Sequence, residues 1–132
     1  KVVASESKDR ITTINVNTMY EDITRTIMKY LEEYICENLN IDDLCSKFSF
    51  SKSYIEYIFK RETGLGIMAK FSEMKIEKAK ELLRNQDYNI TMISEMLGYS
   101  SVHYFSRKFK TVVGMPPSEY ASSIKLKAQT IK

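Results

Sequence analysis

Two stretches of this chain carry the same amphipathic helical pattern. In the first stretch, apolar or small side chains stand at positions i, i+3, i+4 and i+7, which are Ile41, Leu44, Cys45 and Phe48. The same phases recur 49 residues later as Ile90, Ile93, Ser94 and Leu97. This spacing lines one face of an α-helix, so the repeat predicts two short and equivalent helices.

Each copy continues through a turn into a second helix. The turns are Ser49-Phe50-Ser51 and Gly98-Tyr99-Ser100, and beyond them the offset becomes 50 because one residue is inserted in the second turn. The pairs that match at this offset are Tyr54 with Tyr104, Ile55 with Phe105, Phe59 with Phe109, Lys60 with Lys110 and Gly64 with Gly114. The whole repeat is therefore a helix, a turn and a second helix, present twice.

The rest of the chain also favours helices. Apolar residues at helical spacing predict a long helix over 19–38, followed by one that Asn40 or Asp42 caps. A continuous helical stretch over about 67–85 connects the two copies, and Pro117 starts a last helix. With no sustained strand alternation, we predict an all-α protein of about seven helices.

This pattern suggests three segments. We interpret residues 1–17 as a linker or tail, because they show no clear period. Residues 18–84 form the first subdomain with the connecting helix, and residues 85–132 form the second subdomain with the C-terminal helix. The chain starts without Met, so we expect it to belong to a longer protein.

Composition narrows the class of protein. With 43% hydrophobic and 28% charged residues among 132, the chain reads as soluble and globular. It shows neither a membrane-spanning stretch nor a signal-peptide layout, so we expect no membrane partner and a cytoplasmic location. Cys36 and Cys45 are expected to be reduced and buried, and no set of residues predicts a metal site, a cofactor or a catalytic pair.

Charge is distributed unevenly along the chain. Residues 1–50 hold six basic and nine acidic residues, whereas residues 51–132 hold fourteen basic and eight acidic ones. From Arg107 onward there are six basic residues against the single Glu119. A basic C-terminal half is compatible with a polyanionic partner, although a lysine-rich solvated surface would read the same way.

The repeat meets the requirements of a helix-turn-helix. Two helices that cross at about 90–120° need a small residue where their backbones approach, and Cys45 and Ser94 hold that place. Gly98 suits the unusual backbone angles of the turn better than Ser49 does. The predicted buried stripes of the second helices are Ile55, Ile58 and Phe59 in one copy, and Phe105, Phe109, Val112 and Val113 in the other.

The opposite faces of these two helices are then candidates for the major groove of DNA. They display Lys52, Ser53, Glu56, Tyr57 and Lys60 in the first copy, and Val102, His103, Ser106, Arg107 and Lys110 in the second. Arg107 is the strongest base-reading candidate, because its planar fork matches the two acceptors of guanine. Phosphate contacts suit Lys60, Lys108, Lys110 and Lys125.

These side chains have plainer interpretations as well. Glu56 either accepts from a cytosine amino group or pairs with Lys52 or Lys60 on its own helix. His103 on an exposed helix is commonly a solvated polar residue. A helix-loop-helix repeat also occurs in interaction modules, so the alternative is a helical protein-interaction module without DNA affinity of its own.

Longer runs of residues resemble a known family. The run from Gly98 to Lys110, followed by Gly114-Met115-Pro116-Pro117-Ser118-Glu119-Tyr120, is similar to the signature of the AraC/XylS transcription regulators. The segment Ser51–Gly64 resembles the first module of that family, and Lys75–Leu83 resembles its connecting helix. The resemblance extends over about residues 20–125.

This resemblance implies a sequence-specific reader of double-stranded DNA that controls bacterial transcription. Two modules would contact successive major-groove segments about one helical turn apart. The base-facing residues implied by position are Ser53, Glu56, Tyr57, Val102, His103, Ser106 and Arg107, with Lys52, Lys60, Lys108, Lys110 and Lys125 on phosphates. An effector-binding or dimerisation domain is expected upstream, and RNA polymerase is a second candidate partner.

The chain departs from the family pattern at several positions. Its first reading helix has no arginine on the predicted exposed face, which points to Tyr57, Lys52 and phosphate contacts instead. Lys75 stands where the family usually has arginine, and Lys70 where it usually has an aromatic residue. Ser94 replaces a usual alanine, and Ala121 a frequent basic residue.

Overall fold

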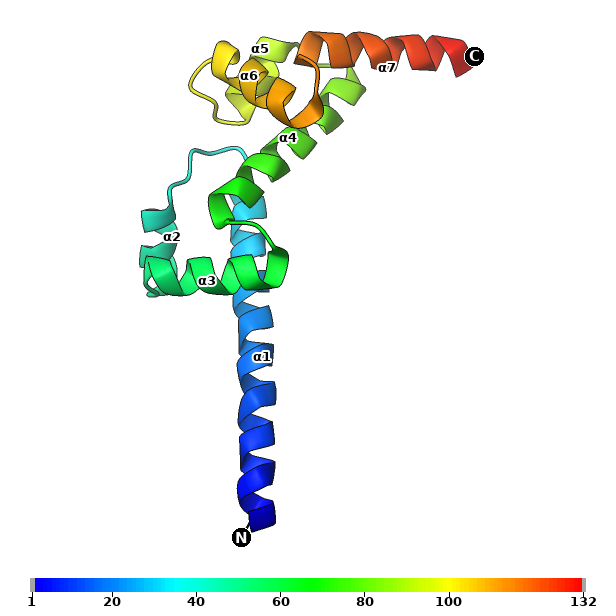
Figure 1. The fold of residues 1–132 in the computed structure, drawn as a ribbon. Coiled ribbons are helices and arrows are strands. Elements are labelled where there is room, and N and C mark those ends of the chain that lie inside the picture. Colours follow the sequence, from blue (N-terminus) through cyan, green and yellow to red (C-terminus); the bar gives the residue numbers. More distant parts are fainter. Residues whose placement is uncertain (1, 132) are drawn as a thin grey trace. The chain divides into compact units, whose positions relative to one another are not determined.

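The computed structural model describes the backbone of residues 2–131 and the side chains of residues 16–127. Within this part of the chain there are seven helices and no strand (Figure 1). In chain order they are α1 (Val2–Glu33), α2 (Ile41–Phe48), α3 (Lys52–Thr63), α4 (Ile67–Asn85), α5 (Ile90–Met96), α6 (Val102–Val113) and α7 (Pro117–Ile131). The predicted all-α fold with two helix-turn-helix units is confirmed, and none of the described helices is both long and apolar enough to cross a membrane.

The chain divides into two compact units. Unit 1 comprises Lys1–Glu32 and Asn40–Ala69, and unit 2 comprises Glu33–Leu39 and Lys70–Lys132. The division therefore falls inside α4, whereas the repeat places a subdomain boundary after Arg84. The segment that follows α1 belongs to unit 2 although α1 itself lies mostly in unit 1. The division into units follows the contacts of the folded chain and does not follow the boundary that the sequence repeat suggests.

Helix α1 differs from the predicted helix over 19–38 at both ends. It begins at Val2, so it includes residues 2–17 that we interpreted as a linker or tail. No glycine or proline occurs before Gly64, so nothing in the backbone chemistry stops the helix from extending there. It ends at Glu33, and the chain turns after it with a hydrogen bond of 3.0 Å from the Glu37 amide to the Tyr34 carbonyl.

The repeat is confirmed by the caps of its helices. Asn40, rather than Asp42, caps α2, and its side chain accepts a hydrogen bond of 2.9 Å from the Asp43 amide. Asn89 caps α5 in the same way, with a distance of 2.8 Å to the Met92 amide. The second helices both start after a serine cap, Ser51 for α3 and Ser101 for α6. Equivalent positions thus satisfy the first free amides with the same chemistry.

Each unit has its own apolar core. The fully buried side chains of unit 1 are contributed by α1, α2, α3 and the first residue of α4, namely Ile27, Leu31, Leu44, Ile55, Ile58, Phe59 and Ile67. In unit 2 the core cluster consists of Ile76, Ala79, Leu83, Ile93, Leu97, Phe105 and Phe109. The predicted stripe of α3 is confirmed. The predicted stripe of α6 is wrong at Val112, which is 50% exposed, because Val113, one position later, is the valine that packs against the core.

The small residues at the helix crossings are placed as the repeat requires. Ser94 is buried, and Cys45 is half-buried at the equivalent position. The expectation that both cysteines are buried is wrong for Cys36, which is exposed, because α1 ends before it and leaves it in the following turn.

Both helix-turn-helix turns use a left-handed residue. Ser49 adopts φ 56° and Gly98 adopts φ 76°. A side chain at Gly98 would have no room, since a methyl group there would lie 2.9 Å from the Cys36 carbonyl oxygen of the same unit. The glycine of the second turn is therefore required both by its backbone angle and by close packing.

We expect Gly98→Ala to lower the free energy of unfolding more than Gly114→Ala. Gly114 is also left-handed, with φ 96°, but a methyl group there would meet nothing within 4 Å. Gly114→Ala should therefore cost only the left-handed strain of roughly 1–2 kcal/mol, and Gly98→Ala that strain plus a backbone clash. Urea unfolding of both variants tests this, and equal losses would contradict the close approach at Gly98.

Candidate nucleic-acid interface

Helix α3 has a buried side and an opposite side that faces solvent. Ile55, Ile58 and Phe59 are completely buried. Ser53, Tyr57 and Lys60 are exposed on the other side, and Lys52 is exposed at the start of the helix. Tyr57 is 57% exposed, which is a high value for a large aromatic side chain. A shallow depression on this face is lined by Ser53, Glu56, Tyr57, Lys60 and Arg61.

Glu56 is the acidic member of this face, and its carboxylate is turned toward the end of the helix-turn-helix. A methyl group placed on Gly66 would lie 3.7 Å from Glu56 Oε2. Gly66 immediately precedes α4, so the carboxylate lies near a helix N-terminus, where negative charge is favourable. In the described part of the chain no ion pair joins Glu56 to Lys52 or Lys60.

Arg61 lies beside Tyr57 and is a residue that sequence reasoning missed. Its Nη1 is 3.5 Å from Tyr57 Oη, and its guanidinium carbon is 5.4 Å from the centre of the Tyr20 ring. Tyr20 belongs to α1, which α3 crosses within unit 1 (Figure 1). Helical side chains point back toward the N-terminus, so a long residue in the last turn reaches the level of the preceding turn. This direction of helical side chains is the signal from which the position of Arg61 beside Tyr57 could have been predicted.

Helix α6 repeats this arrangement with different side chains. Phe105 and Phe109 are completely buried, while His103, Arg107 and Lys110 are exposed. Val102 and Ser106 are half-buried at the edge of the exposed face. The exposed side of α6 therefore displays an imidazole, a guanidinium and an ammonium group at successive turns.

Two of the predicted phosphate-binding residues lie away from that exposed face. Lys108 is half-buried, because it occupies the position that Ile58 occupies in α3, next to the core. Lys125 is exposed on α7, where it lines a cavity of about 310 Å³ together with residues of α5 and the end of α4. Of the phosphate-binding residues predicted for the second module, Lys110 is the one that shares the exposed face of α6 with Arg107 and His103.

The two faces differ in charge. Helix α6 contains Arg107, Lys108 and Lys110 and no acidic residue. Helix α3 contains Lys52, Lys60 and Arg61, but also Glu56 and Glu62. Arg61 Nε lies 3.9 Å from Glu62 Oε2, so part of its charge is compensated locally. The second helix is therefore the more uniformly positive of the two.

Lys75 fixes the segment that leads into α6. Its side chain is only 6% exposed, and its Nζ donates to the carbonyl of Leu97 at the end of α5 and, over 2.9 Å, to that of Ile35. The Nζ also lies 4.9 Å from the centre of the Phe71 ring and 5.5 Å from that of Tyr99. Burial lowers the pKa of Lys75 to about 8, against the charges of Cys36 and Glu37, which raise it. Burial, and then the neighbouring Tyr104, raise the pKa of Tyr99 to about 12.

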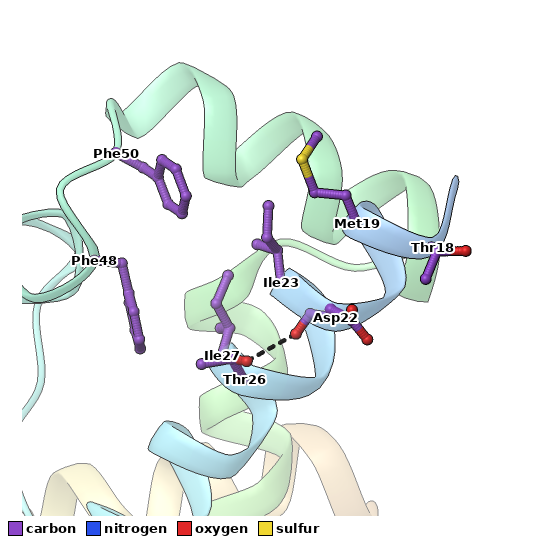
Figure 2. A pocket seen from close by; sticks show the side chains of 8 residues that line it. All are labelled: Thr18, Met19, Asp22, Ile23, Thr26, Ile27, Phe48 and Phe50. Atoms are coloured by element: carbon purple, nitrogen blue, oxygen red, sulfur yellow. Dashed lines mark hydrogen bonds between the residues drawn. The ribbon is translucent and has the colours of Figure 1, made fainter. Parts of the chain in front are cut away.

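A separate apolar cavity of about 350 Å³ lies in unit 1 (Figure 2). Phe48 and Phe50, from the end of α2 and the turn after it, face Ile23 and Ile27 of α1 across it. Its one charged lining residue, Asp22, pairs with Arg25 at 3.0 Å. A cavity with apolar walls and a carboxylate offers nothing that attracts a polyanion, so it is not part of the basic surfaces described above.

Comparison with known proteins identifies similar chains. A protein-family profile described as "Helix-turn-helix domain" matches residues 44–123, which is more than half of the chain. The xylose operon regulatory protein of Escherichia coli K12 is 36% identical over 93 residues, which are 70% of this chain and 24% of that protein. The chain therefore spans about a quarter of the length of that relative.

Solved structures agree with the fold. The C-terminal domain of AraT, a response regulator from Geobacillus stearothermophilus, has a TM-score of 0.74 at 28% identity, covering 76% of this chain and 84% of that one. The DNA-binding domain of AdpA, solved in complex with a target DNA, has a TM-score of 0.74 at 17% identity, covering 79% and 94% of the two chains. The likeness to AdpA supports the seven-helix fold alone.

We expect the stabilising effect of Lys75 to depend on pH. The folded pKa of about 8 lies below the ordinary lysine pKa of 10.5, so the unfolded chain binds more protons between these two pH values. The free energy of unfolding of the wild type should therefore rise relative to that of Lys75→Met as pH increases from 8 to 10, by at most about 1.4 kcal/mol per pH unit. Tyr99 lowers the free energy of unfolding with rising pH, but only above pH 10, where the tyrosine of the unfolded chain loses its proton before that of the folded chain.

The measurement is urea unfolding at several pH values in a Cys36→Ser background, because Cys36 is one of the charges that face Lys75. Subtracting the Lys75→Met values removes the contributions of the other titratable groups. If the difference in free energy of unfolding between the wild type and Lys75→Met stays constant from pH 7 to 10, burial does not lower the pKa of Lys75.

Proposed function

Because the chain belongs to the helix-turn-helix domain family of the AraC/XylS transcription regulators, we propose that it binds double-stranded DNA and regulates bacterial transcription. The observation that carries the proposal is the exposed face of α6. It presents Arg107, Lys110 and His103 to solvent on a helix without acidic residues, while Phe105 and Phe109 anchor the opposite side. This is the arrangement that a helix inserted in the major groove needs.

The second reading helix is α3. It has the same serine cap and terminal glycine as α6, and it buries Ile55 and Phe59 at the positions of Phe105 and Phe109. We therefore infer that the two helices contact successive major-groove segments. Arg107 is proposed to read guanine by a bidentate contact, with His103, Ser106 and Val102 around it. Tyr57 and Ser53 occupy the corresponding face of α3, and Glu56, drawn toward Gly66, contributes less there.

Phosphate contacts are proposed for Lys52, Lys60, Lys110 and Lys125, all of which are exposed. These contacts supply affinity and salt dependence but no sequence information. Lys108 is the least suited of the predicted set, because it is half-buried at the position that corresponds to Ile58. It reaches a phosphate only if its ammonium extends beyond the core on its alkyl stem.

The complete protein is proposed to be larger than this domain. The E. coli relative is a regulatory protein of an operon, and this chain matches 24% of its length. An effector-binding or dimerisation domain upstream, a contact with RNA polymerase and a cytoplasmic location are therefore parts of the same proposal. Catalysis is not part of it, since the family acts by binding.

The experiment that tests the function is selection of bound duplexes from a random pool at two salt concentrations. DNA binding predicts an enriched sequence and an affinity that falls steeply with salt. The alternative, a protein-interaction module, would show no enrichment and salt-insensitive association with a protein such as RNA polymerase. The two outcomes are measured on the same preparation of the full chain.

Once a duplex is selected, Arg107→Ala and Lys110→Ala should have different effects. We expect Arg107→Ala to cost roughly 1–3 kcal/mol of binding free energy and to relax the preference at one base pair. Lys110→Ala should weaken binding to all duplexes by a similar factor and reduce the salt dependence. Fluorescence anisotropy with the selected duplex and its single-base variants separates the two, and unchanged affinity and preference in Arg107→Ala would refute the assignment of α6.

A further inference from the structure

Arg61 is held at the edge of the α3 reading face by two tyrosines. The guanidinium lies 5.4 Å from the centre of the Tyr20 ring, and its Nη1 is 3.5 Å from Tyr57 Oη. The two rings contact each other edge to face, with centroids 6.4 Å apart and an interplanar angle of 82°. The side chain of Arg61 nevertheless remains 49% exposed. It is therefore fixed on one side and open to a ligand on the other.

The equivalent positions of the repeat show what is different in unit 1. Tyr57 corresponds to Arg107, and Arg61 corresponds to Thr111. In α6 the guanidinium belongs to the earlier of the two positions, and the Thr111 hydroxyl donates to the Arg107 carbonyl over 2.9 Å. In α3 an aromatic ring takes the earlier position, and the guanidinium comes from one turn later. Each reading helix thus carries one arginine, at different places.

We propose that Arg61 binds a backbone phosphate of the DNA and that Tyr20 of α1 is the positioning residue that keeps it there. The inference rests on the proposed function and adds a contact that the repeat does not predict. A guanidinium suits this role because its planar set of donors matches phosphate oxygens. The Arg61 Cζ atom lies over the Tyr20 ring, 5.4 Å from its centre, and 49% of the arginine side chain stays exposed to a ligand.

A phosphate, rather than a base edge, fits the position of Arg61. The guanidinium lies on the side of α3 that faces α1, away from the centre of the exposed face. The walls of the major groove, which carry the phosphates, run along the flanks of an inserted helix. Glu62, whose Oε2 lies 3.9 Å from Arg61 Nε, compensates only part of the charge of Arg61. A phosphate brings the remaining counter-charge.

Arg61→Ala tests the contact, with Thr111→Ala as the matched variant at the equivalent place in α6. Affinities for the selected duplex and for its single-base variants are measured by fluorescence anisotropy at four salt concentrations. We expect Arg61→Ala to weaken all duplexes by the same factor and to reduce the slope of log affinity against log salt by about 0.9, the value for one phosphate. Thr111→Ala should leave the slope unchanged.

A double-mutant cycle tests the role of Tyr20. Tyr20→Leu removes the ring and should weaken binding several-fold in the wild type but much less in the Arg61→Ala background. Tyr20→Phe keeps the ring and should retain the affinity and slope of the wild type. If Tyr20 merely stabilised unit 1, Tyr20→Leu would cause the same loss with and without Arg61. Thermal unfolding of each variant shows that it is folded at the assay temperature.

The outcomes separate this inference from the proposed function. If the wild type selects no duplex, the proposed function fails before Arg61 is examined. If the wild type binds and Arg61→Ala keeps its affinity and salt slope, only the phosphate contact is refuted. A loss confined to one base pair would also refute it, because Arg61 would then read a base. Additive effects in the cycle would refute the positioning role of Tyr20.

Discussion

The buried ammonium of Lys75 is the interaction on which the second module depends. The last carbonyls of a helix have no partner within the helix, and an unpaired carbonyl in a core is costly. Lys75 donates to Leu97 at the end of α5 and to Ile35 in the segment after α1, so one side chain of α4 ties both segments together. Gly98 then passes close to the Cys36 carbonyl, and the chain enters α6 from a fixed direction.

The two modules share the same backbone features and differ in the side chains that they expose. Asparagine and serine caps, a left-handed turn residue and a terminal glycine recur at equivalent positions. These features fix the backbone, so the exposed positions of α3 and α6 are free to vary. Helix α6 carries only basic charges, whereas α3 mixes basic and acidic residues and displays Tyr57 and Arg61. We infer unequal shares of base reading and backbone contact for the two helices.

Most of the fold could be predicted because the repeat and the caps are local signals. The helical phases, the turn at Gly98 and the buried stripe of α3 follow from residues close together in the sequence. Other features did not follow from such local signals. Nothing in the sequence marks where α1 begins, and Val113 rather than Val112 packs against the core of unit 2. Arg61 lies against Tyr20, 41 positions earlier on another helix.

The two left-handed turn residues carry this contrast between the modules further. Ser49 accepts a conformation that costs an L-residue roughly 1–2 kcal/mol, and a side chain fits there. Gly98 has no such freedom, because the Cys36 carbonyl occupies the space that a side chain would need. The second turn is thus fixed by packing and by Lys75, whereas the first holds its left-handed residue against backbone preference, with the Phe50 ring packed on that of Tyr54. A helix that reads bases gains most from fixed side-chain positions, and the tighter turn belongs to the module for which we propose Arg107 as the reader.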